Sequence, residues 1–149
     1  MKLFLDCCCY NRPYDDQSQD RIHDGSEAVL SIIHRSRHGK DSIVGSKTLE
    51  LEISMTRDIS RRYNLMLLYS AIESSIPYTS DIKKRAEELL GLSNMKTMDS
   101  LHVASAEVGG ADVFLTTDDK LIKNAKNAEL KIRVMNPVTY LAEVIENDK

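Results

Sequence analysis

The chain has 149 residues, of which 42% are hydrophobic and 29% charged, so it is large enough to bury the continuous core of one globular domain. Its formal net charge of −3 excludes an overall basic surface, and any contact with nucleic acid must therefore depend on a local patch. Asp6 interrupts the apolar start, and neither a long apolar stretch nor a signal-peptide cleavage pattern follows it. We expect a cytoplasmic protein without a membrane segment that forms one domain over residues 1–149.

The first strand is predicted at residues 1–5, and Asp6 follows it directly. Cys7, Cys8 and Cys9 come next, and neighbouring residues of an extended chain point to opposite faces, so this spacing does not suit a zinc site. We interpret the three cysteines as small buried residues that continue the strand or its turn, in a protein of a reducing compartment.

Residues 11–20 are polar and contain Pro13, which predicts a loop that could bind metal, control entry to a site or meet a partner. Beyond it, helices are expected at 22–38, 46–68 in one or two pieces, 80–90, around Asp99, 118–128 and 138–145. Strands are expected at 42–45, 113–116 and 131–135, with a brief extended stretch at 76–78. Ser80 is expected to cap its helix and Gly91 to stop it. Because strands alternate with helices, the predicted fold is a three-layer α/β/α sandwich with a central, mostly parallel sheet.

Three acids are expected at one edge of this sheet. Asp99 lies beside the apolar face of a predicted helix, near its start, while Asp6 and Asp118 each follow a short apolar strand. In open α/β sheets the carboxyl ends of the strands meet at one edge, where sites form. Three carboxylates brought to that edge indicate a divalent cation, because hard ions prefer oxygen ligands and need no histidine.

Four segments of the chain, LFLDCCCYNRP, SKTLELEI, MDSLHVASA and FLTTDDKLI, occur in the order and spacing typical of the PIN domain family. The chain resembles a VapC-type member of that family over nearly its whole length. The resemblance implies an α/β/α fold whose clustered acids bind Mg²⁺ or Mn²⁺ and cut RNA, in a protein that is often a toxin paired with a small antitoxin. It also implies that Asp6, Asp99 and Asp118 are the catalytic acids and metal ligands, with Thr116 as the companion hydroxyl of Asp118.

The fourth acid of the pattern is either Glu50 or Glu52. On a helix these two side chains point about 200° apart, so only one of them can face the site. We favour Glu52, because the apolar positions Leu49 and Ile53 leave it at the rim of the buried face.

Each of these acids also has an ordinary structural interpretation. Asp6 and Asp118 could cap turns or helices, Asp99 could favour the dipole of a first helical turn, and Glu52 could be a surface glutamate. A functional site is favoured because all four acids occur together in the order that is typical of one family. His102, three residues after Asp99, could touch the site, but we favour its interpretation as a packing histidine of the core.

Two functional classes remain. The first is a metal-dependent ribonuclease, and the second is a catalytically silent module of the same fold that binds RNA or protein. A phosphatase that works through an aspartyl intermediate ranks last, because the DCCCY segment lacks a second aspartate two residues after Asp6.

Partner surfaces are also suggested. Arg12 and the run Arg57, Arg61 and Arg62 suit phosphate contact, although a solvated helix face is the ordinary role of such a run. The amphipathic residues 49–68 carry more apolar side chains than one small core needs, unless they all pack internally. We expect this stretch to form a homodimer face or a groove for a small antitoxin.

Overall fold

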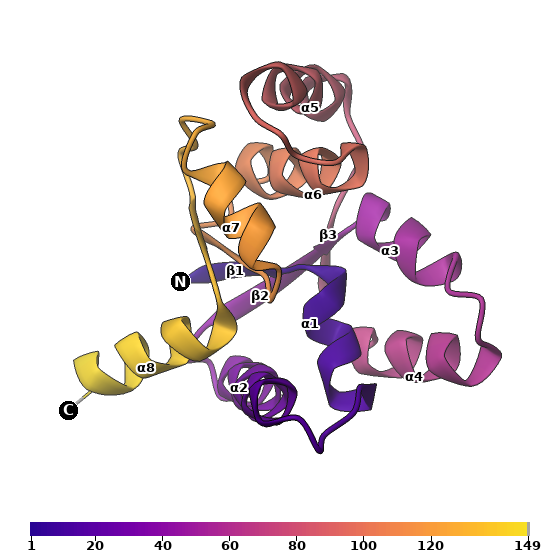
Figure 1. Ribbon diagram of the computed structural model, residues 1–149, viewed down its shortest axis with the longest axis vertical. Helices are drawn as coiled ribbons and strands as arrows, with labels where there is room; N and C mark the ends of the chain where they lie inside the picture. Colours follow the sequence, from indigo (N-terminus) through magenta and orange to yellow (C-terminus); the bar gives the residue numbers. More distant parts are fainter. Residues whose placement is uncertain (149) are drawn as a thin grey trace.

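The computed structural model describes residues 1–148, in which strands and helices alternate along the chain (Figure 1). Five strands of these residues form one parallel sheet in the order β3-β2-β1-β4-β5. Their bounds are β1 (Lys2–Leu5), β2 (Ser42–Ser46), β3 (Ser74–Ile76), β4 (Val113–Leu115) and β5 (Arg133–Met135). Because every strand runs the same way, all five carboxyl ends lie at one edge of the sheet.

Helices cover both faces of this sheet. They are α1 (Cys7–Asn11), the short 3₁₀ helix η1 (Arg12–Tyr14), α2 (Asp20–Arg37), α3 (Lys47–Ser54), α4 (Ile59–Tyr69), α5 (Ser80–Leu92), α6 (Thr97–Val108), α7 (Asp119–Ala125) and α8 (Pro137–Asn147). Helices α5 and α6 pack together on one side of the sheet, and α2 packs against α8 on the other (Figure 1). The predicted α/β/α sandwich with a parallel sheet is therefore confirmed. No helix within residues 1–148 combines the length and the apolar character needed to cross a membrane.

The core is centred on the two middle strands. Residues 3–5 of β1 and 113–115 of β4 are all fully buried, which is why these two runs are entirely apolar. The rings of Phe4 and Phe114 stack across the pair with their centroids 5.3 Å apart. The strand order reverses between β1 and β4, so the residues that follow these two strands lie at the point where open α/β sheets form their sites.

The segment after β1 differs from the prediction. The cysteines do not continue the strand but form helix α1, because the side chain of Asp6 caps this helix by accepting a hydrogen bond from the backbone N–H of Cys7 (2.8 Å). Cys7 and Cys9 are buried as expected, whereas Cys8 is half-buried. The predicted loop of residues 11–20 is confirmed only for residues 15–19: Pro13 lies in the 3₁₀ helix η1, where its missing N–H is not needed, and α2 already begins at Asp20.

Smaller differences concern helix ends. Thr79, rather than Ser80, caps α5 by accepting a hydrogen bond from the N–H of Ile82 (3.3 Å), and Gly91 lies inside this helix instead of ending it. Helix α7 ends at Ala125, a few residues before the predicted end, and Glu129 beyond it has a positive φ of 49°. The long predicted helix of residues 46–68 is two helices, α3 and α4.

Ser46 links the sheet to helix α3, which carries Glu52. Its buried hydroxyl accepts a hydrogen bond from the N–H of Leu49 (2.9 Å) as the cap of α3. We expect Ser46→Ala to lower the free energy of unfolding by about 1 to 2 kcal/mol, because a buried N–H group loses its acceptor. Urea denaturation measures this change. The control Ser60→Ala, on an exposed position of α4, should change the free energy by less than about 0.5 kcal/mol, and equal effects of the two substitutions would contradict the capping role.

Candidate functional site

Asp6 is held at the meeting point of the two central strands. Its backbone N–H donates to the carbonyl of Leu115 (2.9 Å), which ties the end of β1 to the end of β4. Asp6 is 6% exposed. Its carboxylate accepts hydrogen bonds from the backbone N–H of Cys7 and from the hydroxyl of Thr116 (2.8 Å). Burial raises the pKa of Asp6, although the nearby His102 and the bond from Thr116 act to lower it. These interactions therefore offset only part of the unfavourable free energy of burying the Asp6 carboxylate.

Thr116 also positions Asp118. The backbone N–H of Asp118 donates to the hydroxyl of Thr116 (3.1 Å), so one hydroxyl contacts both acids at the end of β4. Asp118 caps α7, with Oδ1 accepting from the N–H groups of Lys120 (3.0 Å) and Leu121 (3.2 Å). The side chain therefore has a structural role as a cap, and Oδ2 is the oxygen that it can offer to a ligand.

Asp99 faces the same region from the first turn of α6. Burial, followed by the charges of Asp6 and Asp118, raises the pKa of Asp99 to about 6. Asp6 and Asp118 thus lie near enough to Asp99 for their charges to act on it, whereas the ligand atoms that come within 4.8 Å of one another in residues 1–148 are those of Asp6, Glu52 and His102. The three aspartates come from the start of α1, from α6 and from the start of α7.

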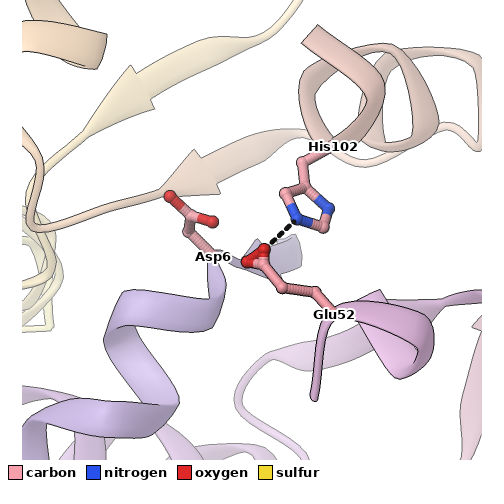
Figure 2. Close-up of side chains that lie close together, drawn as sticks. All are labelled: Asp6, Glu52 and His102. Atoms are coloured by element: carbon pink, nitrogen blue, oxygen red, sulfur yellow. Dashed lines mark hydrogen bonds and ion pairs between the residues drawn. The ribbon is translucent and has the colours of Figure 1, made fainter. Parts of the chain in front are cut away.

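Glu52 and Glu50 point to different surroundings. Glu52 Oε2 lies 3.1 Å from Nε2 of His102, next to Asp6 (Figure 2). Glu50 instead accepts hydrogen bonds at the outer edge of the sheet, from the hydroxyls of Tyr69 (2.8 Å) and Ser75 (2.6 Å). Helix α3 thus brings Glu52 to the other acids and turns Glu50 away from them. Burial acts to raise the pKa of Glu52, but the hydrogen bond and the charge of His102 together hold it below its usual value.

His102 is a member of this site that the sequence interpretation did not include. It is fully buried in the core, as a packing histidine would be, yet its Nε2 atom bonds to Glu52. Its ring lies beside that of Phe4, with the centroids 6.1 Å apart. The available signal was its spacing, because a residue three positions after Asp99 on a helix shares the face of that acid.

The donor atoms of these residues fit a metal ion. One ligand atom each of Asp6, Glu52 and His102 lies within 4.8 Å of the others, and the three come from three separate elements (Figure 2). The two carboxylates of Asp6 and Glu52, with the charges of Asp99 and Asp118 in the neighbourhood, are a set that hard divalent cations such as Mg²⁺ and Mn²⁺ bind well.

Two of the arginines considered for phosphate contact have partners inside the molecule. Asp15 accepts hydrogen bonds from Arg12 (3.2 Å) and from Arg61 (2.9 Å). Arg61 also donates to the side chain of Asn11 (3.0 Å) and to the carbonyl of Tyr14 (2.8 Å), which joins η1 to α4. These two arginines therefore hold the segment that follows α1 against α4.

The raised pKa of Asp99 predicts a pH effect on stability. Its folded state holds a proton more tightly than the unfolded state, so the stability that this proton supplies is complete below pH 4 and is lost as the pH rises through about 6. In EDTA at pH 7 we expect Asp99→Asn to be more stable than the wild type by about 1 to 2 kcal/mol, after discounting for partial exposure to water. The difference should vanish near pH 4.

Denaturant titrations between pH 4 and pH 8 measure this profile. Glu87→Gln, on an exposed position of α5, is the matched control and should follow the wild type at every pH. A constant offset between Asp99→Asn and the wild type across this range would show that Asp99 does not titrate as described.

No family model and no curated protein matches this sequence. Its structure, however, is similar to solved structures. It matches a chain in the crystal structure of VapBC2 from Rickettsia felis bound to a DNA fragment from their promoter, with a TM-score of 0.60 and 16% identity, over 91% of this chain and 98% of that chain. It also matches a chain of FitAB bound to an IR36 DNA fragment, with a TM-score of 0.58 and 13% identity, over 91% of this chain and 95% of that chain. At these identities the likeness is one of fold, and the PIN-like α/β fold predicted from the four sequence segments is confirmed.

Proposed function

We propose that the chain is a Mg²⁺- or Mn²⁺-dependent endoribonuclease whose single domain hydrolyses RNA phosphodiester bonds at Asp6, Glu52, Asp99 and Asp118. The observation that carries this proposal is that Asp6, a buried carboxylate at the reversal point of the sheet, has a ligand atom within 4.8 Å of those of Glu52 and His102, which come from other elements. The fold shared with chains of VapBC2 and FitAB supports it, since the resemblance of the sequence to the PIN domain family implies clustered acids that cut RNA on this fold.

The proposed roles follow from the hydrogen bonds of each acid. When bound, a divalent cation activates water for attack at phosphorus and stabilises the leaving oxygen. Thr116 and the N–H of Cys7 fix the orientation of the Asp6 carboxylate, and the helix N–H groups fix that of Asp118. His102 fixes Glu52. Hydrolysis by water would leave a 5′-phosphate and a 3′-hydroxyl.

Cleavage of labelled mixed-sequence RNA tests this proposal, because the chain offers matched pairs of acids. With Mg²⁺ or Mn²⁺ we expect cleavage by the wild type that EDTA abolishes. Glu52→Gln and Asp118→Asn should each reduce the rate by at least about 100-fold, since they remove a ligand of the ion. Glu50→Gln and Asp119→Asn, one or two positions away in the sequence, should retain most of the activity.

Circular dichroism should show that all four variants fold. Absence of cleavage by the folded wild type with either ion, together with no rise in its melting temperature on adding the ions, would refute the nuclease. It would leave the silent RNA-binding or protein-binding module as the better description.

We also propose that a small antitoxin-like protein docks on the hairpin of α3 and α4. The VapC-type resemblance of the sequence implies such a partner, and the structure is similar to chains of VapBC2 and FitAB. On this hairpin a stripe of large apolar side chains, each between 54% and 73% exposed, lies open to solvent: Leu51, Met55, Ile59, Tyr63, Met66 and Leu67. Exposed stripes at this helical spacing suit an apolar partner segment.

Co-expression with the protein of the adjoining reading frame tests this second proposal. Replacing Ile59 and Met66 by lysine should abolish co-purification, because charged side chains would have to be buried at the contact. The matched control replaces Leu90 and Leu92, exposed apolar residues of α5, by lysine and should leave it intact. If the wild type is a dimer by itself and becomes a monomer when Ile59 and Met66 are replaced by lysine, a second copy of the chain occupies the stripe instead.

A further inference from the structure

We propose that His102 is a direct nitrogen ligand of the metal centre and makes the site selective for a first-row transition ion, represented by Mn²⁺, over Mg²⁺. The inference rests on the metal site proposed above and concerns which ion that site takes. It starts from the one polar contact that His102 makes in the buried interior, the 3.1 Å contact of Nε2 with Glu52.

The distances suit a shared ion. Neighbouring ligands of an octahedral ion with bonds of about 2.1 Å lie about 3 Å apart, and opposite ligands lie about 4.2 Å apart. Nε2 of His102 and Oε2 of Glu52 are 3.1 Å apart, and the ligand atoms of these two residues and Asp6 all lie within 4.8 Å of one another. The nitrogen thus occupies the place of a neighbouring ligand.

Packing alone does not explain a histidine at this position. The residue is fully buried, and Nδ1 has no hydrogen-bond partner among residues 1–148. Burying an unpaired polar atom is unfavourable, and a leucine would fill the same space without that penalty. The reason for an imidazole here must therefore lie in its other nitrogen, Nε2, which faces the acids.

The ring is also held in place before any ion binds. His102 lies in the middle of α6, followed by the buried residues 103–106, and its ring packs beside Phe4 of the central strand β1. A ligand whose rotamer is locked by packing needs little rearrangement to bind, which favours tight coordination.

Nitrogen is the donor that separates the two ions. Mg²⁺ prefers oxygen ligands and gives up its waters reluctantly, whereas imidazole nitrogen suits the first-row transition ions; Mn²⁺ also takes carboxylates, but it accepts a nitrogen ligand more readily than Mg²⁺ does. Four carboxylates alone would accept either kind of ion. With His102 as one ligand, the site should bind the transition ion more tightly.

The competing explanation is that His102 only orients Glu52. His102→Gln separates the two roles, because the glutamine amide can still donate a hydrogen bond near the place of Nε2 but provides no imidazole nitrogen. The measurements should be made in a His34→Gln/His38→Gln background. These two exposed histidines are four residues apart on α2, with ring centroids 4.4 Å apart, and would bind transition ions themselves.

The experiment combines two measurements on the purified, untagged full chain. Pulsed EPR with Mn²⁺ should detect coupling to one ¹⁴N nucleus, and His102→Gln should lose this signal. Calorimetric titrations with MnCl₂ and MgCl₂ should show at least about tenfold tighter binding of Mn²⁺, and His102→Gln should lose about tenfold or more of the Mn²⁺ affinity with little change for Mg²⁺.

Absence of the ¹⁴N coupling in the parent protein would overturn the inference, and so would an unchanged preference for Mn²⁺ in His102→Gln. In either case the nuclease proposal would stand, provided that ions bind and RNA is cut. Failure of both ions to bind would instead refute the proposed metal site itself. If His102→Gln does not fold, the coupling and the affinity ratio of the parent protein decide the question.

Discussion

The carboxylate of Asp6, buried where the two central strands end, is the constraint on which the rest of the structure depends. Its backbone bonds to Leu115, and its side chain bonds to Thr116, so one residue joins β1 to β4. Three hydrogen bonds, from the N–H of Cys7, the thiol of Cys8 and the hydroxyl of Thr116, compensate only part of the penalty for burying a carboxyl group, and the charge of Glu52 adds repulsion. A fold that only needed stability would place an apolar residue here.

A bound cation would offset the repulsion between the carboxylates, because each of them would be attracted to its positive charge. Asp6 comes from the end of β1, Glu52 from α3 and His102 from α6, and these three bring ligand atoms within 4.8 Å of one another. Without positive charge the carboxylates destabilise one another, and with it they become ligands. Functional sites commonly break the rules of stable packing in this way, and the surrounding core supplies the compensation. Here that core is the fully buried pair β1 and β4.

The fold was predictable because its strongest signals are local. The apolar runs of residues 3–5 and 113–115 indicate strands buried on both faces, and an acid directly after such a strand must lie at the carboxyl edge. The choice of Glu52 over Glu50 followed from helical geometry, and the structure places Glu52 beside Asp6 while Glu50 bonds to Tyr69.

The features that could not be predicted from the sequence are of two kinds. Some depend on contacts between residues far apart in the chain, and others on local conformations of similar stability. The bond of His102 to Glu52 and that of Arg61 to Asp15 join residues 50 and 46 positions apart, which no local pattern encodes. Three consecutive cysteines show no hydrophobic periodicity that would distinguish a strand from a helix. The segment forms α1 because Asp6 caps this helix. Thr79 and Ser80 are both good helix caps, and their order could not be told from residue type.

The measurement that tests the central claim most directly is a crystal structure of the chain grown with Mn²⁺, with anomalous scattering recorded to locate the ion. We expect one strong peak about 2 Å from carboxylate oxygens of Asp6 and Glu52, on the side that faces Asp99 and Asp118. A map without anomalous density between these acids at saturating Mn²⁺, or with the ion bound only elsewhere on the chain, would contradict the claim that the buried carboxylates form a metal centre.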